Sequence, residues 1–238
     1  MSYGVWIVWL LGAFLCGSIP FAVLIARSKG VDLRQHGSGN PGATNLGRAV
    51  GKKWGLLCFF LDVGKGLVPT LLFLVPLASG SLRERYELHP QGLESVSNGD
   101  AWRYVQWVLV AVAATLGHVF SPWLKFRGGK GVATGLGGAL GLFPVVTVPG
   151  LLAFGLWYAT CKATGYVGLA SVVAAAALPV LTLGSGLLLG LTPGETAVFV
   201  GLTALLAAVV IARHRGNLAR IRAGTEPKAE WTGRQGKD

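Results

Sequence analysis

The chain has 238 residues, of which 52% are hydrophobic and 13% are charged, and its net charge is +11. Soluble domains carry about 25% charged residues, so half of the usual surface charge is missing. Long apolar runs repeat along the chain, which excludes an ordinary soluble domain and predicts an all-α polytopic membrane protein. The interleaved spans argue against nucleic acid as a partner for the basic charge, which suits anionic lipid or phosphate-bearing substrates.

About seven membrane-spanning helices are expected. A span needs ~20 apolar residues, and fewer where the helix is bent or covered by protein. The runs that meet this criterion, in chain order, are 4–26, 56–78, 103–120, 131–147, 149–161, 166–189 and 195–212. The fourth and fifth runs are short and join around Pro144 and Pro149. A count of five or six spans is therefore the alternative.

The distribution of Lys and Arg predicts how the chain is oriented. With seven spans, 17 of the 21 Lys and Arg residues fall on one side of the membrane, at 27–55, 121–130, 162 and 213–238. Short basic loops stay in the cytoplasm, so we expect the N-terminus outside and the C-terminus inside. Residues 79–102 then form an external loop and residues 213–238 a cytoplasmic tail. A single membrane domain is expected over residues 1–238.

Residues 36–48, HGSGNPGATNLGR, combine glycines with short polar side chains directly after the first span. Glycine lets a backbone approach a ligand closely, and successive N–H groups in such a turn form an anion-binding nest. Arg48 adds a forked cation that suits phosphate. The segment is therefore predicted to bind phosphate, with a flexible loop as the plainer alternative. Its candidate substrate-binding residues are Gly39, Asn40, Thr44, Asn45 and Arg48, and Ser38 is a candidate catalytic residue.

Residues 126–138, FRGGKGVATGLGG, have the same character. Gly128, Gly129 and Gly131 flank Lys130, and a helix is expected to begin at about Val132. A phosphate near a helix N-terminus meets unpaired N–H groups and the positive end of the helix dipole. The segment is not a nucleotide P-loop, because glycine rather than Ser or Thr follows the lysine. The later glycines, Gly135, Gly137 and Gly138, are expected to form a helix-packing face.

A third polar cluster lies at the C-terminal end, in HRGNLARIRAGTEPK. His214 and Asn217 are three residues apart, so they share a face if the last helix continues through them. Each side chain can orient or deprotonate a hydroxyl. An interfacial histidine without a function is the plainer alternative for His214. All three polar clusters fall on the expected cytoplasmic side, which points to one site there.

Three further polar groups lie in or beside the spans. Asp62 and Lys65 are three residues apart in the second span, and a mutual ion pair is the simplest account of them. His118 lies at a span end, where a structural hydrogen bond is expected. Ser171 in the sixth span is either a small helix-packing residue or a functional one.

These segments resemble the bacterial acyl-phosphate-dependent glycerol-3-phosphate acyltransferases, integral membrane enzymes that begin phospholipid synthesis. The resemblance covers nearly the whole chain, and its first two motifs are highly specific. The matching segments are GSGNPGATNLGR (37–48), GHVFSPWLKFRGGKGVAT (117–134), HRGNLARIRAGTE (214–226) and, more weakly, GSIPFAVLIAR (17–27) and DVGKG (62–66).

The resemblance implies transfer of a fatty acyl group from acyl phosphate to the C1 hydroxyl of sn-glycerol 3-phosphate. The products are lysophosphatidate and inorganic phosphate. No metal, nucleotide, coenzyme A or other cofactor is implied. Seven spans, an external N-terminus and a bacterial cytoplasmic (inner) membrane location follow from the same resemblance. The oligomeric state, a monomer or a larger assembly, is left open.

The resemblance also implies roles for individual residues. Ser38, Arg48 and Lys130 match residues that hold phosphate and the reacting centre. The residues that position or activate the glycerol hydroxyl are matched by Ser171, His214 and Asn217. One departure is Gly168, where the family commonly has serine, so any role shared by two serines falls on Ser171 alone.

Two other function classes compete with this interpretation. Coenzyme A or acyl-carrier-protein-dependent glycerophosphate acyltransferases carry His-x4-Asp, and none of the four histidines here has Asp five residues later. A membrane transporter of phosphate or organophosphate is the non-enzymatic alternative, because glycine-interrupted helices often line substrate paths. It predicts polar groups at mid-membrane and an internal repeat, whereas the polar clusters here lie at one face and no repeat is found.

Overall fold

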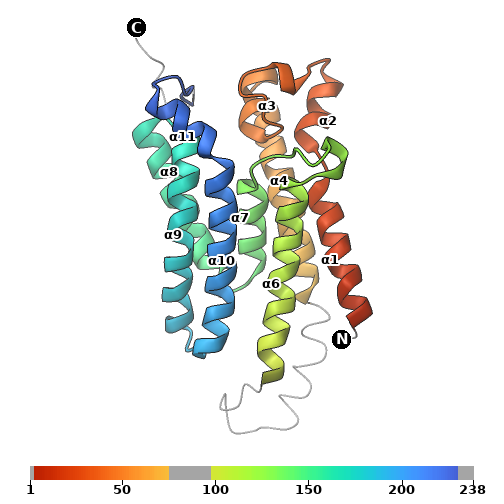
Figure 1. The fold of residues 1–238 in the computed structure, drawn as a ribbon, viewed down its shortest axis with the longest axis vertical. Coiled ribbons are helices and arrows are strands. Elements are labelled where there is room, and N and C mark those ends of the chain that lie inside the picture. The colour runs from red at the N-terminus through yellow and green to blue at the C-terminus, as the bar shows by residue number, and fades with distance from the viewer. Residues whose placement is uncertain (1–2, 75–97, 230–238) are drawn as a thin grey trace. The chain divides into compact units, whose positions relative to one another are not determined.

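A computed structural model describes residues 3–74 and 98–229 of the chain. Every regular element in these two ranges is helical (Figure 1), which confirms the predicted all-α class for the described residues. The chain forms two compact units, Met1–Leu142 and Phe143–Asp238.

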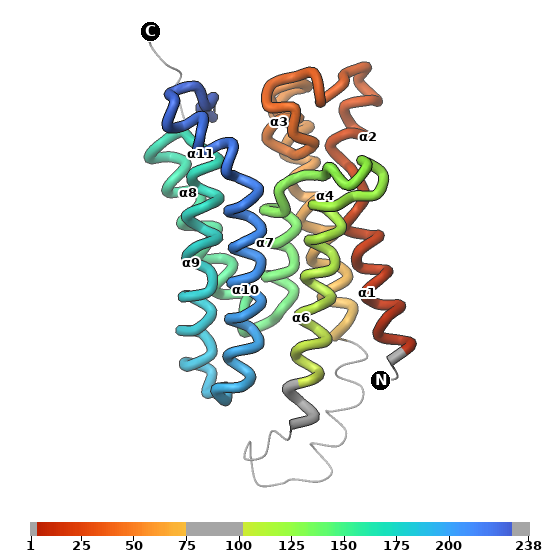
Figure 2. The backbone as a smooth tube through the Cα atoms, viewed as in Figure 1, coloured from red at the N-terminus to blue at the C-terminus, as the bar shows by residue number. Residues whose placement is uncertain are grey.

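The first unit contains two closely packed pairs of parallel helices (Figure 1). Helix α1 packs along α6, and α4 packs along α7. The tube in Figure 2 shows the chain leaving α1 through α2 and returning through α3 into α4. The helices are α1 (Tyr3–Ser18), α2 (Phe21–Ser28), α3 (Ala43–Val50), α4 (Lys52–Leu72), α6 (Asn98–Val119) and α7 (Val132–Gly141), with 3-10 turns at Leu33–Gln35 and Pro122–Leu124.

The span expected near residues 4–26 is confirmed as the candidate span Gly4–Ser28, but its helix is interrupted. Helix α1 ends at Ser18 and α2 begins at Phe21, so the chain breaks at Ile19 and Pro20. Proline has no N–H to donate, and its ring collides with the carbonyl four residues earlier. A hydrogen bond holds the end of α1 at this break, because Ser121 Oγ donates to the Ser18 carbonyl at 2.7 Å.

Helices α4 and α7 approach so closely that only glycine fits at their contact. A Cβ at Gly66 would collide with the carbonyl of Thr134, and one at Gly137 would collide with the carbonyl of Val63. The predicted packing face is thus confirmed for Gly137. It is also confirmed for Gly138, where a Cβ would lie 3.1 Å from Cβ of Ala111 on α6.

Two of the expected spans have different ends in the structure. Helix α7 covers only Val132–Gly141 instead of 131–147, since the segment that contains Phe143 and Pro144 is not helical. Helix α8 is longer than the expected 149–161 and runs over Thr147–Thr164. Proline at position 149 is tolerated there because it lies in the first helical turn.

The second unit is a three-helix layer with a short fourth helix. Helix α9 (Val167–Leu188) packs between α8 and α10 (Pro193–Arg213), and α11 covers Arg215–Arg222. Thr192 and Glu195 form a capping box at the start of α10, with the Thr192 N–H donating to Glu195 Oε2 at 2.9 Å. The predicted helices 166–189 and 195–212 are confirmed to within a few residues.

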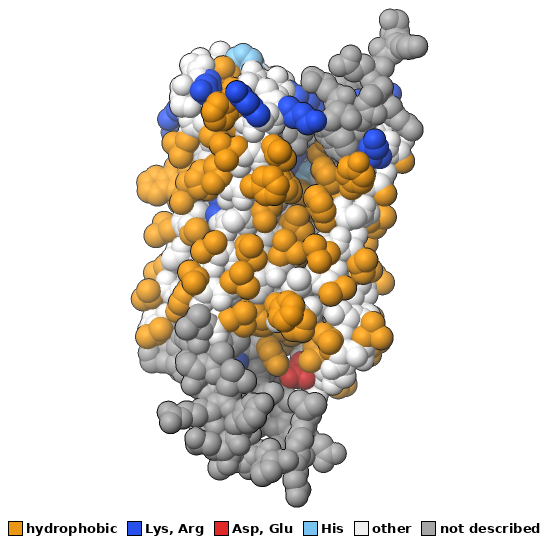
Figure 3. Space-filling view, turned by 180° about the vertical axis from the view of Figure 1, so that it is seen from behind, with side chains coloured by type: hydrophobic (Ala, Val, Ile, Leu, Met, Phe, Trp, Pro, Cys, Tyr) orange, Lys and Arg blue, Asp and Glu red, His pale blue; other side chains and the backbone are white. Residues whose placement is uncertain are grey.

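Five of the described helical segments are long and apolar enough to cross a membrane. Large hydrophobic side chains point outward from them, among them Phe60, Val180 and Leu187, which are 62%, 71% and 69% exposed. Figure 3 shows hydrophobic side chains along the helix flanks, and Lys and Arg side chains toward the α2–α3 end of the first unit. The five spans are Gly4–Ser28, Lys52–Leu72, Trp102–Leu124, Val167–Leu188 and Pro193–Arg213.

Helices extend into both predicted polar segments. Helix α6 begins at Asn98, inside the expected external loop 79–102, of which residues 79–97 lie outside the described residues. Helix α11 occupies the start of the expected tail 213–238. Helix α10 ends at Arg213, so the condition under which His214 and Asn217 would share its face is not met.

Candidate active site

The first glycine loop, residues 36–42, is held in place by Asn45. This side chain is 2% exposed; its Oδ1 accepts the Ser38 N–H at 3.0 Å, and its Nδ2 donates to the His36 carbonyl at 3.0 Å. A third bond runs from Nδ2 to the Leu33 carbonyl at 3.2 Å. Asn45, expected as a ligand donor, thus orients the loop from within.

The loop opens toward solvent around Ser38. Gly37 and Gly39 have φ values of 54° and 65°, which side chains with a Cβ rarely adopt. Ser38 and Thr44 are exposed, and Asn40 is half-buried. Helix α3 begins directly after the loop at Ala43, so its first N–H groups point toward the same region. Arg48 is half-buried on α3.

The second glycine loop, residues 127–131, is bonded to the end of α6. The N–H of Gly128 donates to the Val119 carbonyl at 3.0 Å, and the N–H of Gly129 donates to the His118 carbonyl at 3.1 Å. Lys130 follows, half-buried. Gly131, with φ of 82°, then caps α7. Lys130 therefore lies at a helix N-terminus, as the sequence predicts.

The two glycine loops are joined at one point. The guanidinium Nη2 of Arg34, just before the first loop, donates to the Arg127 carbonyl at 3.1 Å. Buried Leu33 and Leu46 anchor the flanks of the first loop against Cys58 of α4. The first unit thus brings together two of the three predicted polar clusters.

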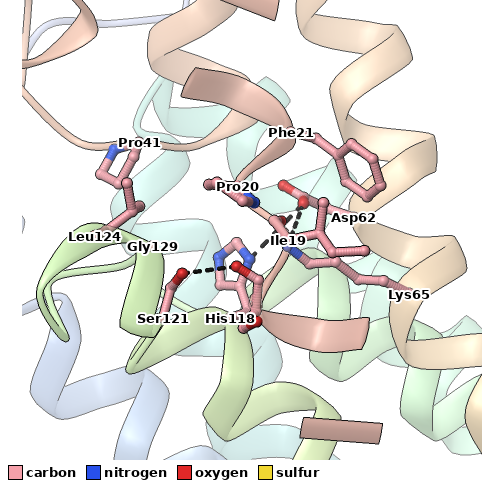
Figure 4. Close-up of a pocket in the computed structure, with 11 residues that line it drawn as sticks. Ile19, Pro20, Phe21, Pro41, Asp62, Lys65, His118, Ser121, Leu124 and Gly129 are labelled. Atoms are coloured by element: carbon pink, nitrogen blue, oxygen red, sulfur yellow. Dashed lines mark hydrogen bonds and ion pairs between the residues drawn. The ribbon is translucent and has the colours of Figure 1, made fainter. Parts of the chain in front are cut away.

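A small hollow lies beside these loops and is lined by polar groups from α4 and α6 (Figure 4). Lys65 Nζ lies 2.8 Å from Asp62 Oδ1, which confirms the predicted mutual pair. His118 Nδ1 lies 3.8 Å from the same oxygen. The hollow is bordered by Pro41 of the first loop and Gly129 of the second.

The second unit carries the third polar cluster. His214 is 3% exposed at the junction of α10 and α11, with Nδ1 2.7 Å from the Val210 carbonyl. Because a carbonyl only accepts, Nδ1 carries the proton, and Nε2 of the neutral ring is the acceptor nitrogen. Asn217 is buried on α11.

Ser171 is buried on α9 and bonded on two sides. Its Oγ donates to the Val167 carbonyl at 2.8 Å and accepts the indole N–H of Trp157 at 3.2 Å. Both of these contacts fit a packing role, and the hydroxyl oxygen has one further lone pair for a ligand.

Sequence reasoning missed Glu226. This carboxylate is 8% exposed; it accepts Asn217 Nδ2 at 2.6 Å and Arg220 Nε at 2.7 Å. The chain returns to the helices beyond it, where the Ala229 N–H donates to the Gly165 carbonyl at 2.8 Å. An acidic residue within a run of Arg and Lys was the available signal.

Comparisons with known proteins place the chain in one family. The family model described as glycerol-3-phosphate acyltransferase matches residues 7–224. A glycerol-3-phosphate acyltransferase of Trichlorobacter lovleyi is 40% identical over 92% of this chain and 95% of its own length. One from Synechococcus is 42% identical over 90% of each chain.

Two solved structures are similar over most of the chain. Both are crystal structures of PlsY (YgiH), an integral membrane glycerol 3-phosphate acyltransferase. Its glycerol 3-phosphate form is 33% identical, with a TM-score of 0.71 over 94% of this chain and 96% of that chain. Its lysophosphatidic acid form is 32% identical, with a TM-score of 0.69 over 94% and 95%.

Proposed function

This chain belongs to the glycerol-3-phosphate acyltransferase family, and on that premise we propose that its acyl donor is a fatty acyl phosphate. It is an integral membrane acyltransferase that acylates glycerol 3-phosphate at the start of phospholipid synthesis. With this donor, the products are 1-acyl-glycerol 3-phosphate and inorganic phosphate.

The pair of glycine loops in the first unit carries the proposal. Each loop precedes a helix N-terminus and has a cation beside it, Arg48 on α3 and Lys130 before α7. Donor and acceptor both bear a phosphate, so the reaction needs two anion sites, and backbone N–H groups at helix ends are suited to both. Gly39, Asn40 and Thr44 belong to the first site; Gly128, Gly129 and Gly131 belong to the second.

Acyl transfer from an acyl phosphate needs no strong acid, because phosphate is a good leaving group. The C1 hydroxyl oxygen attacks the acyl carbon, the bond from that carbon to the phosphate oxygen breaks, and phosphate leaves. Loop N–H groups and the Lys130 ammonium stabilise the oxyanion and the departing phosphate. Ser38, exposed at the rim of the first loop, contacts the reacting phosphate.

His214 is suited to accept the proton of the attacking hydroxyl. Because Nδ1–H donates to the Val210 carbonyl, Nε2 is the basic nitrogen of the neutral ring. The departing phosphate is the alternative acceptor. Asn217 and Ser171 orient the hydroxyl. Positioning of this kind supplies much of an enzyme's rate enhancement.

The acyl tail lies among the apolar helices while the phosphates stay at the loops. We infer seven spans, with the N-terminus outside and the loops on the cytoplasmic face of a bacterial inner membrane. The whole chain acts as one membrane domain, and the reaction uses no metal, nucleotide or coenzyme A.

Two alanine variants test the assignment of the loops. Lys130→Ala and Arg48→Ala are expected to lower turnover by about 100-fold or more, as for removal of one oxyanion donor. Arg127→Ala is the matched control. Its side chain is exposed, and the hydrogen bond to Arg34 uses its backbone carbonyl, which alanine keeps. Near-normal phosphate release by either loop variant would contradict that residue's role.

Proteoliposomes separate this function from transport. The protein should form lysophosphatidate and release phosphate without concentrating glycerol 3-phosphate inside. Uptake of phosphate or glycerol 3-phosphate without product would support the transporter instead, for which the broken α1–α2 segment is the favouring feature.

A further inference from the structure

The proposed mechanism makes no use of the buried polar residues Asp62, Lys65 and His118, here called the Asp62 cluster. Their side chains are 3%, 3% and 8% exposed. Ionisable groups within a membrane span are costly, and those that persist are paired and functional. Figure 4 shows all three side chains converging on the hollow beside the glycine loops.

Lys65 connects the cluster to the segment that leads into the first loop. Its Nζ lies 2.8 Å from Asp62 Oδ1 and donates to the Ile19 carbonyl at 2.8 Å. Ile19 lies at the break between α1 and α2, and α2 is followed directly by the turn that enters the first loop. One ammonium group therefore ties α4 to the start of that segment.

His118 connects the cluster to the second loop. Its Nδ1 lies 3.8 Å from Asp62 Oδ1. On the other side of the ring, a Cβ at Gly129 would collide with Nε2. The His118 carbonyl accepts the Gly129 N–H, so both the ring and the backbone of this residue contact the residue before Lys130.

We propose that the Asp62 cluster holds the two glycine loops at a fixed separation. Asp62 pairs with Lys65, which fixes the approach to the first loop, and lies against the ring of His118, which fixes the loop of Lys130. All three are positioning residues and none contacts substrate. The inference rests on the proposed function, because that function gives the two loops their ligands.

His118→Ala tests the cluster without leaving a buried charge unpaired, since Asp62 keeps Lys65. The variant is expected to lower kcat by about 100-fold, as for a displacement of about 1 Å at a reacting centre, with KM for both substrates changed by less than about threefold. His118→Gln, which keeps bulk against Gly129, should recover most of kcat. Thr115→Val on the same helix is the matched control: that hydroxyl bonds its own helix at Ala111.

Hydrogen exchange supplies a readout that does not depend on turnover. The peptide over residues 126–134 should lose protection in His118→Ala and keep it in Thr115→Val, because the Gly128 and Gly129 N–H groups bond to the end of α6. Peptides from α9 and α10 should not change. Unchanged exchange at 126–134, or an unchanged kcat, would overturn the inference.

A second variant covers the case in which His118→Ala does not fold. Asp62→Asn combined with Lys65→Met removes both charges at similar volume, so no unpaired charge stays buried. It is expected to show the same loss of kcat and of exchange protection at 126–134. Wild-type values of both would overturn the inference.

A double-variant comparison separates failure of this inference from failure of the proposed function. If His118 acts through Lys130, then His118→Ala should lower turnover no further in a Lys130→Ala background. An additive loss would contradict action through Lys130. If Lys130→Ala alone is fully active, the assigned role of Lys130 fails, and hydrogen exchange still decides whether His118 holds the loop.

Discussion

Gly168 lies where α9 meets the side chain of Asn217. A Cβ at this position would lie 2.7 Å from Cβ and 3.0 Å from Nδ2 of Asn217. The serine that the family resemblance leads one to expect here would therefore displace Asn217. Glycine at position 168 therefore allows Asn217 of α11 to lie close against α9.

Gly168→Ala and Gly168→Ser should displace Asn217 and lower kcat by about tenfold or more, because sub-ångström placement controls such steps. Gly184→Ala is the matched control on the same helix, because a Cβ there meets nothing within 4 Å. Steady-state assays of the three variants, with melting temperatures, check the prediction. Full activity of Gly168→Ser would mean that Asn217 tolerates the displacement.

At the residue scale, composition identified the glycine loops but not how they use their donors. The side-chain amide of Asn45 hydrogen-bonds the Ser38 N–H and the carbonyls of Leu33 and His36, so it is used within the protein. A donor-rich segment has the same composition whether its donors face inward or toward a ligand. The role of Glu226 depends on a turn that brings it back to Asn217, which residue spacing does not encode.

The α4–α7 contact is the feature most sensitive to substitution at the element scale. Gly66→Ala should separate the two helices and destabilise the protein by about 1–3 kcal/mol, the usual cost of overpacking. Gly64→Ala, two residues earlier on α4, meets nothing within 4 Å and should leave stability unchanged or slightly raised. Thermal unfolding in one detergent compares the two. Equal melting temperatures would contradict the close contact.

Glu226 holds the C-terminal segment against α11. Glu226→Ala removes the acceptor of Asn217 and Arg220 and should cost about 1–3 kcal/mol, as for hydrogen bonds to a charged group. Chemical or thermal unfolding in detergent measures this loss of stability. Glu226→Gln keeps an amide oxygen as acceptor and is expected to lose less stability than Glu226→Ala. A Glu226→Ala variant as stable as the wild-type protein would show that the segment contributes nothing.

Hydropathy located the centres of the helices but not their ends or breaks. Residues 4–26 form one apolar run, yet Pro20 divides it. Helix α4 begins at Lys52, before the apolar run expected from residue 56, and hydropathy does not detect its charged first turn. Pairings such as Gly66 with Thr134 depend on how two helices cross, and a single sequence carries no direct record of that crossing.

The expected orientation, with the N-terminus outside and the C-terminus in the cytoplasm, can be tested by cysteine labelling. In a cysteine-free background, Gly194→Cys lies at the exposed start of α10, and Arg222→Cys lies at the exposed end of α11. An impermeant maleimide should label position 194 in intact cells and position 222 only in inverted vesicles. The reverse pattern would place the C-terminus outside and contradict the charge-based orientation.

The central claim is that the enzyme takes its acyl group from acyl phosphate. The purified protein in lipid would receive glycerol 3-phosphate with either palmitoyl phosphate or palmitoyl-CoA, and lysophosphatidate and phosphate would be measured. We predict product from palmitoyl phosphate alone, with phosphate released in equal amount. Product formed equally well from palmitoyl-CoA would contradict the account of the two phosphate loops.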